Sequence, residues 1–370
     1  MNLYIAFELS NKKWKIAFTT GEKIRLRTID AGDRAAFLSE VGRVRELWKL
    51  PRAIRMRSVY EAGRDGFWIH RWLESLGIDN IVVDPASIEV SRRKRRVKTD
   101  RSDVNALVRQ LMRYHGGERK VWSVVRVPRP QAEDERRGER EIRTLKKERT
   151  AHIARIKSLL ALHGCKPRSL KNLPKQLAQM RQWDDTALPP AVSAEILRMW
   201  QRMELLREQI RGMEKARAQA LKEPRTHAQR TAARLASLRG VGEIGAMLLS
   251  LEFFAWRKFG NVREVGACAG LTGTAYDSGE SLREQGISKA GNKRVRALII
   301  ELAWSWLRHQ PGSALSGWFR ERFAAGRRSR RIGIVALARK LLVALWKYLS
   351  RGEVPEGARL KPAAQEPAAG

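Results

Sequence analysis

The chain begins with three alternating segments: LYIAFE (Leu3–Glu8), KWKIAF (Lys13–Phe18) and KIRLRTI (Lys23–Ile29). In the second segment Trp14, Ile16 and Phe18 occupy alternate positions, which places them on one face of a β-strand. Polar residues at Ser10-Asn11 and at Thr20-Gly21 separate the segments and are typical of turns. The pattern predicts a three-stranded antiparallel meander.

Helical and extended patterns then alternate: a helix over about Asp33–Trp48, a strand over Ile54–Glu61, a helix over Gly66–Leu76, a strand over Asn80–Asp84 and a helix that opens near Thr99. Within the first of these helices, Phe37, Val41 and Val44 keep the spacing of one helix face. Three hairpin strands followed by alternating helix and strand are typical of a ribonuclease-H-like α/β domain. We expect this domain over residues 1–122.

Long helices are predicted after Val124–Pro130, a proline-containing segment with the composition of a linker. A helix between Asp134 and His163 is followed by a second over about Pro190–Leu221. The second helix carries apolar residues at intervals of three and four: Ile196, Met199, Met203, Leu206, Ile210 and Met213. This heptad seam predicts either a helical hairpin within the chain or a coiled coil between chains, over residues 131–230.

A mainly helical domain is predicted over residues 231–350. The stretch 351–370 contains three prolines and several alanines without a periodic apolar pattern, and we expect it to be a disordered tail. The first residues lack a basic stretch followed by an apolar core, and charged residues interrupt the later apolar runs. Neither secretion nor a membrane span is therefore predicted.

The charge of the chain points to a polyanionic partner. Its 370 residues include 74 Lys and Arg against 39 Asp and Glu, which gives a formal net charge of +35. Such an excess repels itself unless an anion neutralises it, and nucleic acid is the abundant polyanion of a cell. A membrane surface is the weaker alternative, since the cations occur throughout the chain. The isolated Cys165 and Cys268 argue against a disulfide scaffold or a structural zinc and favour the cytoplasm.

Four carboxylates are candidate metal ligands and catalytic groups. Glu8 ends the first predicted strand, Glu61 ends the fourth, and Asp100 and Asp103 lie three residues apart at the start of a helix. In a ribonuclease-H-like sheet the first and fourth strands are neighbours, so we expect the four acids to converge. Mg²⁺ prefers such oxygen ligands, and two ions can stabilise both the attacking and the leaving oxygen in phosphoryl transfer. Alternatively, the two aspartates only complement the helix dipole.

Two further segments are candidate phosphate-binding sites. A basic run before the helix is expected to lay a phosphate chain beside the acids: Arg92, Arg93, Lys94, Arg95, Arg96 and Lys98. The turn Arg239-Gly240-Val241-Gly242 opens a helix and resembles a helix-hairpin-helix element, in which Gly240 and Gly242 let backbone N–H groups approach a phosphate. A plain tight turn between packed helices is the alternative.

The segment 269–294 is glycine-rich, polar and basic, and we expect a loop there. Its candidate nucleic-acid contacts are Arg283, Lys289, Lys293 and Arg294. The hydroxyls of Thr274, Ser278, Ser281 and Ser288 are each open to the simpler interpretation of a turn or cap. No Gly-x-Ser-x-Gly elbow occurs and the six histidines are scattered, so a nucleophilic serine here would require activation by cations and metal.

The order of these motifs resembles the transposases of insertion-sequence family 110 over almost the whole chain. The resemblance rests on these motifs: Ile5–Glu8, Tyr60–Gly63, Lys98–Ala106, Arg239–Gly242, Ala269–Thr272, Tyr276–Gly279 and Ile287–Asn292. It implies a RuvC-like amino-terminal domain whose four acids bind Mg²⁺, with Mn²⁺ as a substitute. It also implies a helical hairpin and a carboxy-terminal domain with a nucleophilic serine, which by the matching motif is Ser278.

For the reaction, the resemblance implies serine attack on a DNA phosphate and a transient protein–DNA phosphoester. It further implies a dimer or tetramer whose composite site joins the acids and the serine of different subunits. The resemblance also implies a structured guide RNA from the element's own non-coding end. The implied localisation is the bacterial cytoplasm, in association with the nucleoid.

One position departs from the family pattern, because Glu8 stands where Asp is usual. A displacement of about 1 Å can cost on the order of a hundredfold in rate. Two alternatives therefore stay open beside the recombinase: a catalytically decayed nucleic-acid-binding protein, and a metal-only junction endonuclease that cuts without Ser278.

Overall fold

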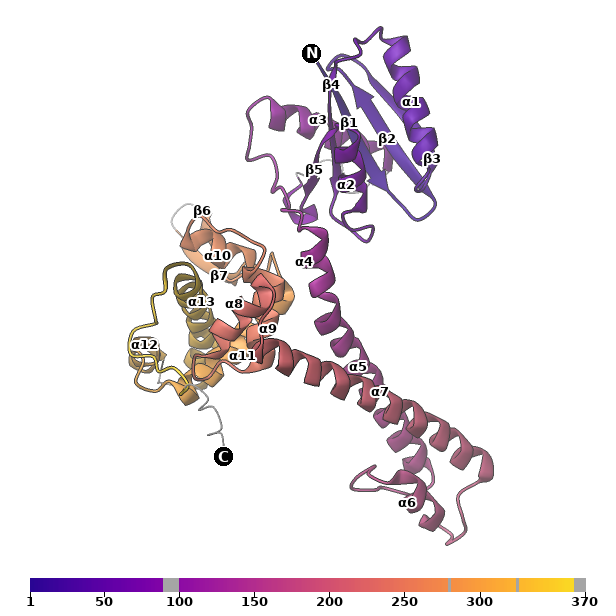
Figure 1. Cartoon of the computed structure of the whole chain (residues 1–370), viewed down its shortest axis with the longest axis vertical. Coiled ribbons are helices and arrows are strands. Elements are labelled where there is room, and N and C mark those ends of the chain that lie inside the picture. Colours follow the sequence, from indigo (N-terminus) through magenta and orange to yellow (C-terminus); the bar gives the residue numbers. More distant parts are fainter. Residues whose placement is uncertain (89–99, 279–280, 324–325, 363–370) are drawn as a thin grey trace. The chain divides into compact units, whose positions relative to one another are not determined.

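A mixed five-stranded sheet forms the centre of the amino-terminal region (Figure 1): β1 (Asn2–Leu9), β2 (Lys13–Thr19), β3 (Ile24–Asp30), β4 (Arg55–Glu61) and β5 (Asp79–Val83), with a 3-10 turn η1 (Pro85–Ser87) after β5. The strand order is β3-β2-β1-β4-β5. β1 is antiparallel to β2 and parallel to β4, and β4 is parallel to β5. The predicted meander, the two later strands and the adjacency of the first and fourth strands are confirmed.

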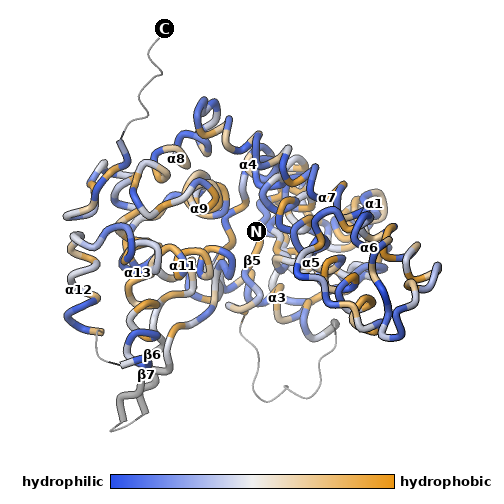
Figure 2. Tube along the Cα trace, turned by 90° about the horizontal axis from the view of Figure 1, so that it is seen from below, coloured by the Kyte–Doolittle hydropathy of each residue, from blue (hydrophilic) through white to orange (hydrophobic). Residues whose placement is uncertain are grey.

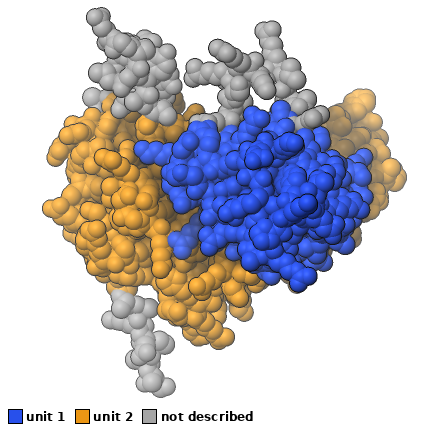
Figure 3. All heavy atoms as spheres, turned by 90° about the horizontal axis from the view of Figure 1, so that it is seen from above, with its two compact units in different colours: residues 1–127 blue, residues 128–370 orange. Residues whose placement is uncertain are grey.

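The structure is a computed structural model that describes residues 1–88, 100–278, 281–323 and 326–362. The chain divides into unit 1, residues 1–127, and unit 2, residues 128–370 (Figure 3). No helix among the described residues is both long enough and apolar enough to cross a membrane.

Helices cover both faces of the sheet, because successive residues of a strand point to opposite sides. One face packs on α1 (Arg34–Leu47) and α2 (Trp68–Ser75), and the other packs on α3 (Asp100–His115). Phe7 of β1 belongs to the first of these cores and the neighbouring Ala6 to the second. The α/β class predicted for this region is confirmed.

Unit 1 is completed by the segment after α3, which returns to the edge of the sheet. Val124 pairs with Val83 in an isolated antiparallel bridge, and the Val125 amide donates to the Val82 carbonyl oxygen at 2.7 Å. The first half of the predicted linker Val124–Pro130 therefore belongs to unit 1, which ends at residue 127 rather than 122. Backbone pairing of this kind needs no apolar periodicity, so the sequence carried no signal for it.

A helical hairpin opens unit 2: α4 (Pro130–Glu135), α5 (Arg137–Leu162), α6 (Leu173–Gln179) and α7 (Pro190–Lys222). The predicted seam of α7 is buried from Ile196 to Ile210. Ile156 and Leu160 of α5 share a hydrophobic core with Ile196. Gly164, with φ of 77°, follows the end of α5. Of the two arrangements predicted for the seam, the structure shows the hairpin within the chain.

The rest of unit 2 is mainly helical, as predicted: α8 (His227–Ala236), α9 (Glu243–Leu249), the π-helical turn η3 (Ser250–Phe254), α10 (Val262–Cys268), β6 (Gly273–Ser278), β7 (Ser281–Ile287), α11 (Lys293–His309), α12 (Ala314–Phe323) and α13 (Arg327–Arg351). Phe253, Trp306 and Leu341 are fully buried in its core. Figure 2 shows the strongly hydrophobic stretches of α9 and α11, which contribute to that core.

An antiparallel hairpin, β6–β7, lies where the sequence predicted a loop. Tyr276 pairs with Arg283, and Ser278 pairs with Ser281. Neither strand alternates apolar and polar residues along its length, because glycines and polar residues interrupt both. The periodicity on which strand prediction depends is therefore missing.

The expectation of a disordered tail from residue 351 does not hold for residues 352–362. Leu360 pairs with Leu238 in an isolated antiparallel bridge, and the Arg239 amide donates to the Arg359 carbonyl oxygen at 3.1 Å. The Lys361 Nζ donates to the Val241 carbonyl oxygen at 2.9 Å. This segment is held by backbone and polar bonds rather than by an apolar stripe, so its composition was misleading. Residues 363–370 lie outside the described residues.

The hairpin and the carboxy-terminal helices belong to one unit, although a boundary was expected between residues 230 and 231. Ala220 and Leu221, at the end of α7, pack against a small core that includes Ala228 and Met247. The apolar contact continues from α7 into α8 and α9, so contacts do not thin out at the expected boundary.

Candidate functional site

Glu8 and Glu61 lie on one face of the sheet at the carboxyl ends of two neighbouring parallel strands. Ala6 of β1 pairs with Val59 of β4. Glu8 lies two residues after Ala6, and Glu61 lies two residues after Val59. A two-residue step returns to the same face, and that face is the one on which α3 packs. Glu8 is half-buried and Glu61 is exposed. The predicted proximity of these two acids thus follows from the register.

The helix with the two aspartates begins at the same end of the sheet. The ring of His115, the last residue of α3, lies 6.2 Å from the ring of Tyr4, near the start of β1. The other end of α3 therefore points toward Glu8, because the helix lies along the sheet with Val104 and Leu111 in the core beneath it. Asp103 occupies the first turn and accepts a bond from the Ser102 hydroxyl at 3.3 Å. Asp100 begins the helix, but its side chain lies outside the described set.

Whether these acids bind a metal stays a prediction. Among the described side chains, no group of three or more His, Cys, Asp or Glu is arranged to hold a metal ion. The carboxylate of Asp100, one of the four proposed ligands, is not among the described side chains. The donor set itself fits Mg²⁺, because every proposed ligand atom is a carboxylate oxygen. The predicted basic run Arg92–Lys98 lies wholly outside the described residues.

Ser278 is the last residue of β6 and lies at the closed end of the β6–β7 hairpin. Its backbone pairs with that of Ser281, the first residue of β7. Arg283, a predicted nucleic-acid contact, is two residues further along β7. The side chains of these three residues are outside the described set. The structure therefore assigns Ser278 a place at a hairpin tip, and its role as nucleophile stays a prediction.

The two glycines predicted to bind phosphate differ in their surroundings. Gly240 has φ of 81°, and a β-carbon added to it would lie 3.3 Å from the Ser305 carbonyl oxygen of α11. The Ser305 hydroxyl donates to the Gly240 carbonyl oxygen at 2.8 Å. Packing against α11 thus requires glycine here, as the tight-turn alternative proposed. Gly242 is exposed at the N-cap of α9 with open space around its α-carbon, so only Gly242 offers room for a ligand.

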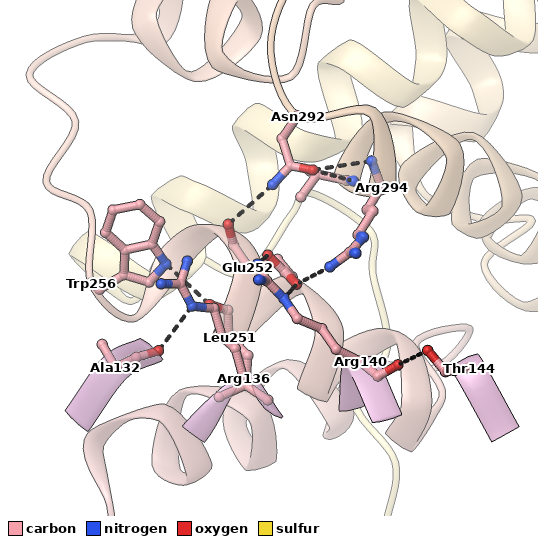
Figure 4. Close-up of polar contacts among 10 residues, drawn as sticks. Ala132, Arg136, Arg140, Thr144, Leu251, Glu252, Trp256, Asn292 and Arg294 are labelled. Atoms are coloured by element: carbon pink, nitrogen blue, oxygen red, sulfur yellow. Dashed lines mark hydrogen bonds and ion pairs between the residues drawn. The ribbon is translucent and has the colours of Figure 1, made fainter. Parts of the chain in front are cut away.

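Arg294 is held in an ion-pair cluster that the sequence did not reveal (Figure 4). Glu252, in η3, is 5% exposed. Its carboxylate accepts from Arg140 Nε at 2.9 Å and Arg140 Nη2 at 3.0 Å, and from Arg294 Nη1 at 2.9 Å. Burial alone would raise the pKa of Glu252, but hydrogen bonds and charges from Arg140 and Arg294 outweigh it, so the pKa lies below its ordinary value. Nucleic-acid binding by Arg294 would compete with this carboxylate.

One signal in the sequence could have revealed this cluster. Glu252 stands inside the apolar run Met247–Phe254, and a carboxylate in such a run is buried only with a cationic partner. Nothing local identifies Arg140 as that partner, since it lies on α5.

Of the other predicted contacts, Lys289 and Lys293 are exposed, and Lys289 has φ of 56°.

Comparisons with known proteins agree on one family. Residues 232–316 match the model of the Transposase IS116/IS110/IS902 family. The chain is 43% identical to "Putative transposase y4rJ" of Sinorhizobium fredii over 97% of this chain and 94% of that relative. It is 27% identical to the transposase for insertion sequence element IS1328 of Yersinia enterocolitica, over 54% of this chain and 60% of that protein. It is 28% identical to the transposase for element IS1111A of Coxiella burnetii, over 56% of each.

These matches define the protein's class as a DNA transposase. Within that class, the chain belongs to the IS116/IS110/IS902 family, as the order of its motifs predicted.

Proposed function

We propose that this transposase cleaves and rejoins DNA through Ser278, assisted by divalent metal bound to Glu8, Glu61, Asp100 and Asp103. The observation that carries the proposal is the register of β1 and β4, which brings Glu8 and Glu61 together at the carboxyl ends of parallel strands. The first turn of α3 lies toward the same end, and it carries both aspartates. The helix-dipole alternative explains acids in the first turn of a helix, but it does not explain why two strands place acids at the same end of the sheet.

The reaction follows from the chemistry of these groups. The Ser278 oxygen attacks the phosphorus of a DNA phosphodiester, its proton passes to solvent or a carboxylate, and one bridging sugar oxygen leaves as a hydroxyl. A hydroxyl of the recipient strand then attacks the phosphorus of the serine–DNA diester, which releases serine and restores a phosphodiester. When bound, Mg²⁺ or Mn²⁺ would neutralise the negative charge that develops on the phosphate. The carboxylates' part is to hold the ion at the sheet edge.

The finer structural assignments belong to the same proposal. The strand order β3-β2-β1-β4-β5 with three antiparallel and then parallel strands supports a ribonuclease-H-like, RuvC-like unit 1. The exposed Gly242 at the start of α9 supports a helix-hairpin-helix contact to DNA phosphate, whereas Gly240 has a packing role. A guide RNA and a homo-oligomer rest on the motif resemblance, and the charge of +35 is consistent with both nucleic acids as partners.

A second candidate is a transposase copy that binds nucleic acid without cutting it. Glu8 favours it, because the longer side chain displaces the carboxylate relative to the Asp usual in the family. The variant Glu8→Asp separates the candidates. If the parent is inactive and the variant recombines DNA, the decayed copy is supported; an active parent excludes it.

The decisive experiment detects the covalent intermediate. The purified chain is incubated with labelled element-end DNA and Mg²⁺, with and without RNA from the element's non-coding end, and protein–DNA adducts are resolved under denaturing conditions. We expect an adduct that disappears in Ser278→Ala and in Glu61→Gln. Ser281→Ala is the matched control, because Ser281 is the strand partner of Ser278, and it should retain the adduct. An unchanged adduct in Ser278→Ala refutes the serine role, and cutting without an adduct in that variant identifies a metal-only endonuclease.

A further inference from the structure

A groove of about 1220 Å³ crosses the carboxy-terminal part of unit 2, and of the predicted nucleic-acid contacts it includes Lys289. One face of α13 forms its floor, and α12 forms one wall through Trp318. The base of the β6–β7 hairpin forms another wall, through Gly273 and Ile287 (Figure 1 labels these elements). The groove therefore begins beside the hairpin whose first strand, β6, ends at Ser278.

The floor of the groove is apolar and accessible. Residues of α13 that line it recur at the spacing of a single helix face, and they include Ile332, Val335, Ala336, Val343 and Ala344. Ile332 is 59% exposed, although it is a large apolar residue on a helix whose opposite face is buried in the core. The other four apolar residues of the floor are half-buried, and an apolar strip left partly open to solvent is typical of a surface that another molecule covers.

The cations that line the groove indicate that this molecule is negatively charged. The described residues that line the groove include five basic residues and no carboxylate, and the five are Lys289, Arg331, Arg339, Lys340 and Lys347. Within the described part of the chain, none of these five forms an ion pair with an acid. The Lys340 ammonium lies 4.7 Å from the centre of the Trp318 ring, so the aromatic wall itself carries a cation. An anion with flat apolar parts matches this surface.

We propose that this groove binds an unpaired DNA strand, with phosphates on the cations and bases against the apolar floor and Trp318. Single-stranded nucleic acid presents both kinds of group at once, whereas a duplex hides its base faces and would leave the floor bare. The DNA source follows from position, since β6 runs from Gly273 in the groove to Ser278, roughly 17 Å at the rise of a strand. This choice of DNA rests on the proposed role of Ser278 as a DNA nucleophile.

The first test measures binding with the charge of the groove reduced. Arg331→Gln with Arg339→Gln is compared with Arg202→Gln with Arg211→Gln, two exposed arginines of α7. Fluorescence anisotropy with a labelled 12-nucleotide single strand gives the dissociation constant over a range of salt. If two phosphate contacts are lost, the log–log salt slope should fall by about 1.4 in the groove variant, since each contact on a single strand contributes about 0.7. An equal fall in the control pair overturns the proposal.

The second test uses the apolar floor. Ile332→Glu places a carboxylate in the groove without disturbing the buried core, because Ile332 is largely exposed. We expect about tenfold weaker binding of the single strand. Leu205→Glu is the matched control on α7, where the exposed fraction is 56%, and its affinity should stay within twofold of the parent. Circular dichroism of both variants confirms the fold.

Duplex DNA and single-stranded RNA of the same sequence complete the design. For Ile332→Glu, a loss of duplex affinity equal to the loss of single-strand affinity overturns the proposal, because a duplex cannot use the floor. A loss for RNA without a loss for DNA overturns it in favour of the RNA partner. Binding is measured in Ser278→Ala as well. If the groove variants weaken single-strand binding but the covalent adduct forms equally in Ser278→Ala, only the proposed function is refuted. An adduct that depends on Ser278 with groove variants that bind like the parent would refute only the groove.

Discussion

Removing the charge of Glu252 should destabilise unit 2 far more than removing an exposed charge. Glu252→Gln keeps the shape of the side chain but leaves an amide where the carboxylate accepted three bonds from Arg140 and Arg294. Breaking a buried pair from one side typically costs about 3–5 kcal/mol. Here the side chains of Arg140 and Arg294 are 45% and 43% exposed, so water can solvate them after the change. We therefore expect a loss of about 2–3 kcal/mol in the free energy of unfolding.

Urea unfolding followed by circular dichroism provides the measurement, with Glu353→Gln as the control. Glu353 pairs with Arg351 at 3.5 Å with a side chain 52% exposed, so its loss should change the free energy by about 0.5 kcal/mol or less. Arg140→Gln combined with Glu252→Gln should cost less than the two changes added together, because each variant removes the same contacts. If the losses in the free energy of unfolding for Glu252→Gln and for Glu353→Gln differ by less than about 0.5 kcal/mol, the reasoning is refuted.

Three further predictions concern stability. The pKa of Glu252 is lowered in the folded chain, so its stabilisation is present above the unfolded-state pKa and is lost as pH falls through the folded one; the difference between the parent and Glu252→Gln in urea unfolding should therefore shrink in acid. Gly240→Ala should destabilise by about 1–3 kcal/mol because φ is 81° and α11 is close, whereas Gly212→Ala, in the exposed middle of α7, should stabilise by up to about 1 kcal/mol in the same assay. Deleting residues 352–370 should lower the melting temperature through loss of the bonds to the Gly240 turn, and deletion of 363–370 alone is the control; equal melting temperatures for the two deletions would contradict the described packing.

Much of the fold was predictable because its signals are local. The alternation in Lys13–Phe18 placed β2 within a residue of its observed end, and the heptad spacing of α7 identified the buried seam from Ile196 to Ile210. Glu8 and Glu61 were also recognisable as a pair, because the order of strands determines which carboxyl ends become neighbours. Family membership followed from motifs that are short and contiguous in sequence.

Apolar periodicity along the chain thus determined the strands, the helices and the hairpin seam, since one-sided burial leaves a repeat of two or of 3.6 residues. The tertiary structure alone decided the rest. The partners of Glu252 lie 112 and 42 residues away, and the bridge partner of Leu238 is Leu360. No local pattern announces such a partner, because backbone bonds and ion pairs depend on where distant segments meet. The groove along α13 is of the same kind, since its walls come from α12 and the β6–β7 hairpin and exist only once these elements pack together.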